Sequence, residues 1–298
     1  MAATHRLSRD HIVYSLDRHH RAALEIDSGD TVVFETWDAR TGTIRCDADL
    51  LDCAHPDGAN PATGPVQVRG AQPGDAVVVE ISGIELAESG FLAVKAGQGL
   101  LASRADQYAT RIVPVVDGMC HFGPDIRFPA HPMVGVVGTA PAGEGVSTGL
   151  AGAHGGNMDN RLLGEGCRVY LPVAVPGALL GLGDVHAAMG DGEITFIGLE
   201  ICAVVTTRIE LLPGRAPARP LIETPDAWAT TAAADSLAAA ARLAADGMVD
   251  LMCERLGLTF EDAYMLASAV VDVQICQCCE PGAFPVTARA VLPKAVLA

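Results

Sequence analysis

PGDAVVVEISGIEL, at residues 73–86, and SGDTVVFET, at residues 28–36, show the pattern that decides the fold of this chain. In both, a Gly-Asp pair precedes a run of β-branched residues, which is typical of a tight turn followed by a strand. Similar runs, with Gly and Pro at their joints, follow at residues 111–116, 134–138, 168–172 and 193–205. No strand is regularly followed by a helix of about ten residues, which disfavours a parallel βαβ sheet. The pattern predicts a mainly β chain, a sandwich- or barrel-like body of antiparallel strands over about residues 1–225.

The composition changes near residue 226, where a segment rich in alanine and leucine begins. Residues 226–245 predict a helix. A second helix is predicted from Thr259, whose hydroxyl can cap the first turn, to about Gln274, and Gly257 is the expected C-cap between them. We therefore expect a single domain over residues 1–298, with a helical layer at about 226–275 packed on the β body and a tail at 276–298.

Composition and charge exclude several classes of protein. The 298 residues are 50% hydrophobic and carry 20 basic against 36 acidic side chains, a net charge of −16. This charge repels phosphate backbones and anionic membranes, so we expect no nucleic-acid partner. No run of about twenty apolar residues lacks charge, Gly and Pro, as a membrane span would require. The polar start MAATHRLSRD lacks the apolar region of a signal peptide, and the nine cysteines favour buried thiols over disulfides, so we expect a cytoplasmic protein.

Two clusters of polar residues combine acids with turn-forming residues. In the segment 34–38, Glu35 and Asp38 lie near a strand end and could bind a cation, or could be solvated at an exposed edge. In the segment 153–159, glycines permit positive φ, so that His154, Asn157 and Asp159 can converge on a metal ion or an oxyanion. The alternative for this second cluster is a glycine-rich turn whose side chains satisfy local backbone donors.

The third cluster, GDVHAAMGDGE at residues 183–193, is the richest in candidate metal ligands. Asp184 and His186 are separated by one residue, so on an extended segment both side chains leave the same face. Asp191 and Glu193 flank a glycine in a turn that could place another carboxylate near the same ion. The alternative is the polar tip of a β-hairpin.

Together, AHGGNMDNRLLGEGCRVYLPV and LGLGDVHAAMGDGEITFIGLE resemble the signature region of the acetamidase/formamidase family. The resemblance extends to DSGDTVVFETWDA, NPATGPVQVRGAQPGDAVVVEI, HPMVGVVG and FEDAYMLASAVVDVQICQ. It implies a β-rich fold and hydrolysis of a small amide, such as formamide or acetamide, to ammonia and a carboxylate. The family's motif residues fall on His154, Asp159, Asp184, His186, Asp191 and Glu193. Met189 stands where the family pattern has glutamine, which makes a bulkier or cyclic amide, a lactam, the alternative substrate.

Amide hydrolysis needs a strong nucleophile, a sink for oxyanion charge and a proton for the leaving ammonia. A divalent ion, Zn²⁺ or another such as Ca²⁺, can supply the first two through a metal-activated water. We expect the metal ligands Asp159, Asp184 and His186, joined by Glu35 or His154. The expected catalytic residues are Glu193 as general base and acid, Asp191 in reserve, and Asn157, with the Gly155 and Gly156 amides, at the oxyanion. The residues expected to line the substrate site are Gly155, Gly156, Met189 and His131.

Other chemistries find less support in the sequence. Only Lys95 and Lys294 are available as lysines, and neither stands in a Ser-Ser-Lys or Glu-Lys-Cys amidase motif. The Cys276-Gln277-Cys278-Cys279 group lacks the second Cys/His pair of a zinc finger. A non-catalytic metal- or ligand-binding β domain, recognisable by full protein coordination of the ion, is the alternative of a different class. Apolar β surfaces and the family resemblance favour a homodimer or larger homo-oligomer.

Overall fold

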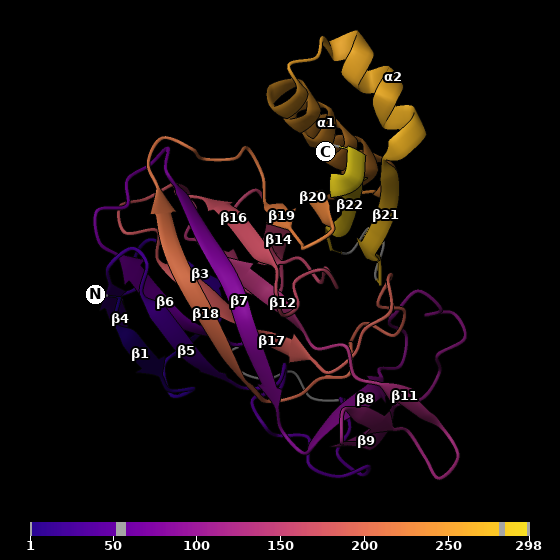
Figure 1. The fold of residues 1–298 in the computed structure, drawn as a ribbon. Coiled ribbons are helices and arrows are strands. Elements are labelled where there is room, and N and C mark those ends of the chain that lie inside the picture. Colours follow the sequence, from indigo (N-terminus) through magenta and orange to yellow (C-terminus); the bar gives the residue numbers. More distant parts are fainter. Residues whose placement is uncertain (1, 52–57, 280–283, 297–298) are drawn as a thin grey trace.

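The structure, a computed structural model, describes residues 2–51, 58–279 and 284–296, and β-strands are its main regular secondary structure (Figure 1). The largest sheet has nine strands, in the order β1 (Thr4–Leu7), β5 (Thr31–Thr36), β18 (Ala203–Leu212), β7 (Ala76–Leu86), β16 (Arg168–Pro172), β19 (Leu221–Glu223), β20 (Ala227–Ala234), β22 (Val286–Pro293) and β21 (Asp272–Gln277). The second has seven, with β14 (Ala151–Gly152), β15 (Gly155–Asn157), β12 (Met133–Gly138), β17 (Leu180–His186), β6 (Ala62–Val68) and β2 (Ile12–Val13) in order and β4 (Leu24–Ile26) paired to β6.

Two smaller sheets complete the β structure. One is β11 (Arg127–Pro129), β10 (Met119–His121), β9 (Ala109–Val116) and β8 (Ser89–Val94), and the other is β13 (Val146–Ser147) with β3 (Ser15–Leu16). Neighbouring strands are antiparallel except for β1 with β5 and β4 with β6. The predicted mainly β fold with antiparallel strands is therefore confirmed.

The core lies between the two large sheets. On β5, Val32 and Phe34 are fully buried while the residues between them are partly exposed, as expected for a strand with one face inward. These side chains share one hydrophobic cluster with Val134 of β12 and Leu182 of β17. Every residue of β12 and of β17 is buried. The polar end of β17, with Asp184 and His186, is thereby enclosed in the interior.

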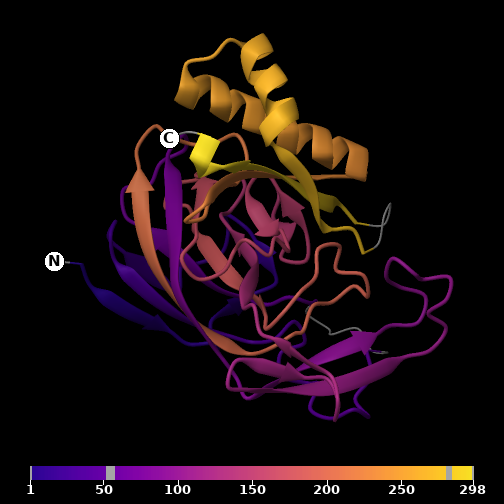
Figure 2. The same cartoon turned by 45° about the vertical axis from the view of Figure 1, so that its right-hand side comes forward.

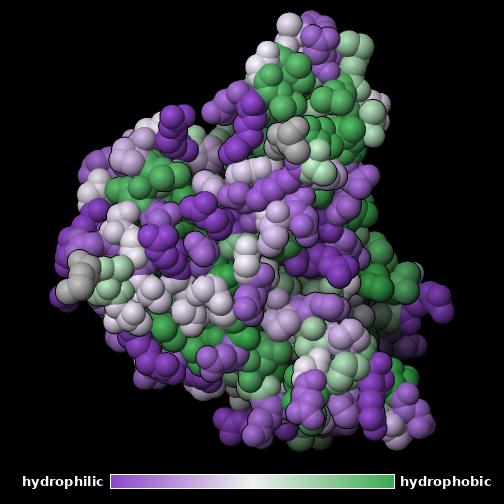
Figure 3. Space-filling model, viewed as in Figure 1, coloured by the Kyte–Doolittle hydropathy of each residue, from purple (hydrophilic) through white to green (hydrophobic). Residues whose placement is uncertain are grey.

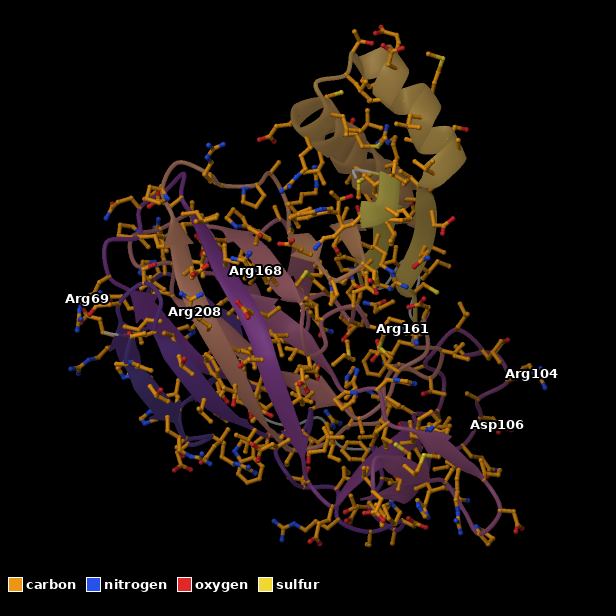
Figure 4. The ribbon with its side chains drawn as sticks, viewed as in Figure 1. Arg69, Arg104, Asp106, Arg161, Arg168 and Arg208 are labelled. Carbon is orange, nitrogen blue, oxygen red and sulfur yellow. The ribbon has the colours of Figure 1, made fainter. Side chains whose placement is uncertain are left out.

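The outer face of the nine-stranded sheet carries ion pairs instead of a site. The Glu210 carboxylate accepts hydrogen bonds from Arg168 Nη2 at 2.9 Å and lies 2.7 Å from Arg208 Nη1. Figure 4 shows both arginines beside the long strands β7 and β18. Partly exposed pairs of this kind contribute about 0–1 kcal/mol each. They keep the outer face of the sheet hydrated, whereas the opposite face is buried.

The C-terminal segment departs from the sequence expectation. Residues 226–245, predicted as one helix, form strand β20 and only then the start of helix α1 (Leu237–Leu256), which is capped by Ser236. β20 pairs with β22 along its whole length, from Ala227 opposite Pro293 to Ala234 opposite Val286. This pairing overrides the helix propensity of alanine. The expected tail, 276–298, is likewise not a tail, because it contains β22.

The two predicted helix signals between α1 and α2 (Phe260–Val270) are confirmed. Gly257 ends α1 in the left-handed conformation, with φ 64°, and the Thr259 side chain accepts a hydrogen bond from the Asp262 N–H. The second helix stops at Val270 instead of about Gln274, because the chain enters β21. Figure 2 shows both helices lying over the β20–β22–β21 end of the large sheet, and a short 3₁₀ turn (Lys294–Val296) follows β22.

The helical layer has its own hydrophobic cluster, in which Met248 and Met252 of α1 meet Trp228 of β20 and Leu292 of β22. Among the described residues, no helix has both the length and the apolar character that crossing a bilayer would demand. Figure 3 shows hydrophobic surface gathered over this helical projection. The oligomeric state remains a prediction.

Candidate metal centre and substrate cavity

Four carboxylates and one histidine converge in the interior where β17 ends. One ligand atom from each of Asp159, His186 and Glu193 lies within 4.8 Å of the others, and the same holds for Asp184, His186 and Glu200. His186 belongs to both groups, and its Nε2 lies 3.0 Å from Glu200 Oε1 and 3.7 Å from Asp184 Oδ1. All five side chains are buried. The predicted ligand pair Asp184 and His186 is thus brought together with Asp159 and Glu193, as expected.

The backbone at this centre is held in uncommon conformations. Asp159, Asp184 and Glu193 all have positive φ, at 43°, 55° and 47°. Non-glycine residues adopt this region rarely, and such strain clusters at functional sites. Gly135 on β12 leaves the room that the carboxylates occupy, because a Cβ there would lie 2.7 Å from both Asp159 Oδ1 and Asp184 Oδ2.

Many polar atoms at the centre have no protein partner. Among the described residues, no hydrogen bond reaches either oxygen of Asp159, Asp184 Oδ1, Glu200 Oε2 or either ring nitrogen of His186. Asp184 Oδ2, by contrast, accepts a hydrogen bond from Asn60 Nδ2 at 3.0 Å. Native proteins rarely leave buried polar atoms unpaired. Oxygens and a nitrogen facing one point are the donor set that divalent cations such as Zn²⁺ use.

The electrostatics of the centre also favour a bound cation. Burial raises the pKa of Asp159 to about 7 and that of Glu200 to about 8, and the charge of Asp184 adds to both effects. Burial and the neighbouring Asp159 raise the pKa of Glu193 well above its usual value. Burial lowers the pKa of His186, but the neighbouring carboxylates of Glu200 and Asp184 outweigh it and raise the pKa. So many buried acids can ionise together only beside a cation.

The structure separates Glu35 and Asp191 from this centre. Glu35 lies on the partly exposed face of β5, where its Oε1 accepts a hydrogen bond from Arg6 Nε at 2.7 Å. Asp191 instead binds the buried Arg289 through two hydrogen bonds, of 2.9 Å and 2.6 Å. Neither residue is in the groups that could hold an ion among the described residues. The strand alternation that turns Phe34 and Thr36 inward turns Glu35 outward, which explains the wrong prediction.

Two of the expected substrate-binding residues also lie elsewhere. His131 is exposed, and its N–H donates to the Ala187 carbonyl. Met189 is buried, and neither residue is part of the cavity wall described below. Both predictions rested on position in a motif, which does not determine where a side chain points.

The glycine-framed segment contributes in a different way from that expected. Gly155 and Gly156 have φ of 91° and 84°, and both pair with β12 on one side and β14 on the other. This disfavours their amides as free oxyanion donors. A Cβ on Gly156 would lie 3.1 Å from His154 Nε2, so Gly156 leaves room for that ring. Burial lowers the pKa of His154 to about 4, which keeps the ring neutral, and it lies outside the two ligand groups.

Glu200 was not predicted from the sequence, and Glu35 was the wrong choice of acid from the segment 34–38. Glu200 interrupts the apolar run 197–203, and its backbone forms a bridge to His186. A single acid in such a run is itself a signal, because buried charges need partners. Asp38, not Glu35, lies near the centre. Burial, with the charge of Asp184 as a smaller cause, raises its pKa, against hydrogen bonds from Gly42 and Arg40 that lower it.

The cysteines that the structure describes take no part in the centre. All eight cysteines within the described ranges are free, in agreement with the expectation of reduced thiols. Burial raises the pKa of Cys276 to about 12. No cysteine belongs to the groups that could hold an ion in the described part of the chain. The Cys276, Cys278 and Cys279 group is therefore a packing feature, with all three side chains buried.

A cavity of about 370 Å³ opens directly above the centre. Its polar floor includes Asn60, Asn157, Glu193 and Glu200, so two of the four carboxylates of the centre are accessible to a small molecule. Asn157, expected at the oxyanion, is thus in reach of a bound ligand. An accessible acid beside a cluster of candidate ligands is the arrangement of a catalytic centre, in contrast to a closed structural site.

Fold and site together define a β-sandwich protein with an enclosed carboxylate–histidine centre at the floor of a cavity. The model of the acetamidase/formamidase family matches residues 6–151 and 142–297, and the chain belongs to this family.

Solved structures and curated relatives agree with this membership. The crystal structure of an acetamidase from Bacillus halodurans is 37% identical, covers 98% of each chain and has a TM-score of 0.94. One from Thermoanaerobacter tengcongensis, described as a predicted acetamidase/formamidase, is 37% identical over 100% of this chain and 98% of its own, with a TM-score of 0.95. A formamidase of Methylophilus methylotrophus is 29% identical over 50% of this chain and 51% of its own. The chain spans between 51% and 61% of the length of the curated relatives it matches.

Proposed function

We propose that this protein is an amidase that uses a divalent cation to hydrolyse a non-peptide carbon–nitrogen bond, releasing ammonia and a carboxylate. The observation that carries the proposal is the buried convergence of Asp159, Asp184, Glu193 and Glu200 on His186, beneath an accessible cavity. The names of its relatives, acetamidase and formamidase, support the amide as the substrate class.

The cation would be held by His186 with Asp159, Asp184 and Glu200, each of which has at least one buried polar atom without a hydrogen-bond partner among the described residues. When bound, it would supply Lewis-acid catalysis, polarising the amide carbonyl and easing the deprotonation of water. Asn60 holds Asp184 Oδ2 through its side-chain amide, which fixes the orientation of one ligand. Zn²⁺ is the ion that this mixed set of oxygen and nitrogen donors fits best.

Glu193 is the proposed proton carrier. It is buried, lies on the cavity floor and has a raised pKa, the condition in which a carboxyl group can take a proton from water and return it to the leaving nitrogen. Asn157, on the same floor, would donate its side-chain N–H to the developing oxyanion. In the overall reaction the carbonyl–nitrogen bond breaks, a bond to the water oxygen forms, and the nitrogen leaves as ammonia.

Chelation tests the role of the cation. We expect that removing metal from the full-length protein abolishes ammonia release from acetamide, and that adding Zn²⁺ restores it. His186→Ala, which removes the residue shared by both ligand groups, should lower the metal content and the activity together. Activity that persists after verified metal removal would contradict the proposal. Retained metal without turnover of any amide would instead indicate the non-catalytic binding domain.

A further inference from the structure

The cavity above the centre is larger than a one-carbon or two-carbon amide requires. Its volume of about 370 Å³ falls in the range of about 300–1,000 Å³ typical of pockets that enclose drug-sized ligands. Acetamide, with a single methyl group beside the carboxamide, would leave most of this space to water. The excess volume indicates a substrate with a larger acyl group.

The wall of the cavity carries apolar side chains from four separate segments, beside the polar side chains of Arg40, Lys95 and Gln98. The apolar side chains include Leu51, Leu150, Phe196, Ile197 and Phe284, whereas the floor carries the carboxylates. The rings of Phe196 and Phe284 lie 6.3 Å apart at an angle of 38°, within the distance of an aromatic pair. Phe284 is nevertheless 41% exposed, so it retains apolar surface that a ligand could cover.

Phe196 is held in place by the segment that carries the proposed proton carrier. Its φ of 87° is an outlier for a bulky side chain. The Phe196 N–H donates to the Glu193 carbonyl at 3.0 Å, and the Gly198 N–H donates to Glu200 Oε1 at 3.0 Å. The turn at residues 193–200 therefore presents the acids and the aromatic wall to the same cavity. Strain of this kind persists where the surrounding structure fixes it and marks functional positions.

We propose that the substrate is a primary amide with an apolar acyl group about the size of phenylacetyl, seated on the wall formed by Leu51, Leu150, Phe196, Ile197 and Phe284. This inference rests on the proposed amidase function and specifies its substrate class. The carboxamide reaches the floor, where Glu193 and Asn157 lie, while the acyl group displaces water from the wall. Water and the amide yield phenylacetate and ammonia, with no other reactant.

A series of amides tests the acyl preference on the metal-loaded, full-length protein. Formamide, acetamide, butyramide, hexanamide and phenylacetamide are compared by ammonia release. Burial of each additional CH₂ should raise kcat/KM about fourfold until the cavity is filled, and phenylacetamide should exceed acetamide about 100-fold. A maximum at formamide or acetamide overturns the proposal and leaves the amidase function intact.

Variants of the wall separate the acyl site from general effects on folding. Phe196→Ala and Phe284→Ala, on different segments, should each lower the ratio of kcat/KM for phenylacetamide to that for acetamide at least fivefold. Phe260→Ala, on the exposed face of α2 at 54% exposure, is the matched control and should leave this ratio unchanged. If all three variants keep the wild-type ratio, the assignment of the wall is overturned.

Product binding keeps the two proposals distinguishable. Phenylacetate should bind the metal-loaded protein more tightly than acetate in calorimetry, and Phe196→Ala should remove the difference. If no amide is cleaved but this difference is present, the amidase function fails and the apolar acyl site stands. If phenylacetate and acetate bind equally tightly, the proposed acyl site is wrong, whether or not the protein cleaves amides.

Discussion

The role of Glu193, the proposed proton carrier, can be isolated by a substitution that changes only its carboxyl group. Glu193→Gln keeps the size of the side chain but removes its ability to accept a proton, while Asp184, His186 and Glu200 still form a group that could hold the cation. We expect metal content at the wild-type level and a fall in kcat of about 100- to 10,000-fold. Ammonia release and elemental analysis measure the two effects.

Glu144→Gln serves as the control, since Glu144 is exposed on a turn. It should match the wild type in both assays. Wild-type turnover by Glu193→Gln would place the proton carrier elsewhere.

Asp191 has a structural role in place of the catalytic one that the motif suggested. Its two hydrogen bonds to Arg289 neutralise a guanidinium that is only 3% exposed. Nη1 of the same guanidinium lies 3.2 Å from Oδ1 of Asn160, the residue that follows the proposed ligand Asp159. Asp191→Asn leaves this charge uncompensated, and because Asp191 is itself one-third exposed we expect a loss of about 2 kcal/mol in unfolding free energy.

Denaturant unfolding measures this loss, and Asp125→Asn, at an exposed position, should show none. An unchanged midpoint for Asp191→Asn would mean that water or another group replaces the carboxylate at Arg289.

At the level of single residues, the sequence predicted ligands where the motif fixed the backbone. Asp184 and His186 were found because they are two apart on a buried strand, and Asp159 because it follows glycines. Glu200 was missed because its proximity to His186 depends on a strand bridge that no local pattern encodes. Asp38 and Glu35 differ only in which side of the strand end they occupy, and that depends on packing.

Among the elements, β20 shows most clearly where sequence patterns fail. Its segment, Ala227–Ala234, is alanine-rich and continues into a true helix, so its composition alone predicts helix. The deciding contacts come from β22, about sixty residues later in the sequence. The C-cap of α1 at Gly257 and the N-cap of α2 at Thr259 were predicted correctly, because caps are local hydrogen-bond arrangements.

The N-terminal strand β1 depends on one carboxylate. Asp30 accepts hydrogen bonds from the Ala3 N–H at 2.7 Å and the Asp27 N–H at 3.0 Å, and pairs with His5 at 2.9 Å. The Ala3 hydrogen bond is the largest cause that lowers the pKa of Asp30 to about 2. Because the folded pKa is below the unfolded value of 3.8, this stabilisation is present above about pH 4 and is lost as the pH falls through about 2.

Asp30→Asn should therefore lower the unfolding free energy by about 2 kcal/mol at neutral pH, and the difference from the wild type should shrink between pH 4 and pH 2. Unfolding curves across this range measure it. Asp106→Asn, in an exposed loop (Figure 4), is the control and should follow the wild type throughout. A difference that stays constant down to pH 2 would contradict the role of the carboxylate.

For the molecule as a whole, the β architecture was predictable because each strand carries its own alternation and turn signals. The assembly of the centre was only half predictable. The residues proposed to hold the cation come from the loop after β15, from β17 and from the segment 193–200, and Asn60, which donates to one of them, lies two residues before β6. Long-range pairing of strands, which brings these parts together, is a property of the folded chain and has no local signature.

The last strands of the chain hold the segment that carries Glu193. The Gly192 N–H donates to the Cys276 carbonyl, and the Cys278 N–H donates to the Gly192 carbonyl. Arg289 of β22 donates a hydrogen bond to Asp191. During synthesis on the ribosome, β21 and β22 emerge after every residue of the centre has already left the exit tunnel. The acids therefore stay exposed and mutually repelling until β21 and β22 have been synthesised and have paired, so the pocket proposed to take up the cation is completed late in folding.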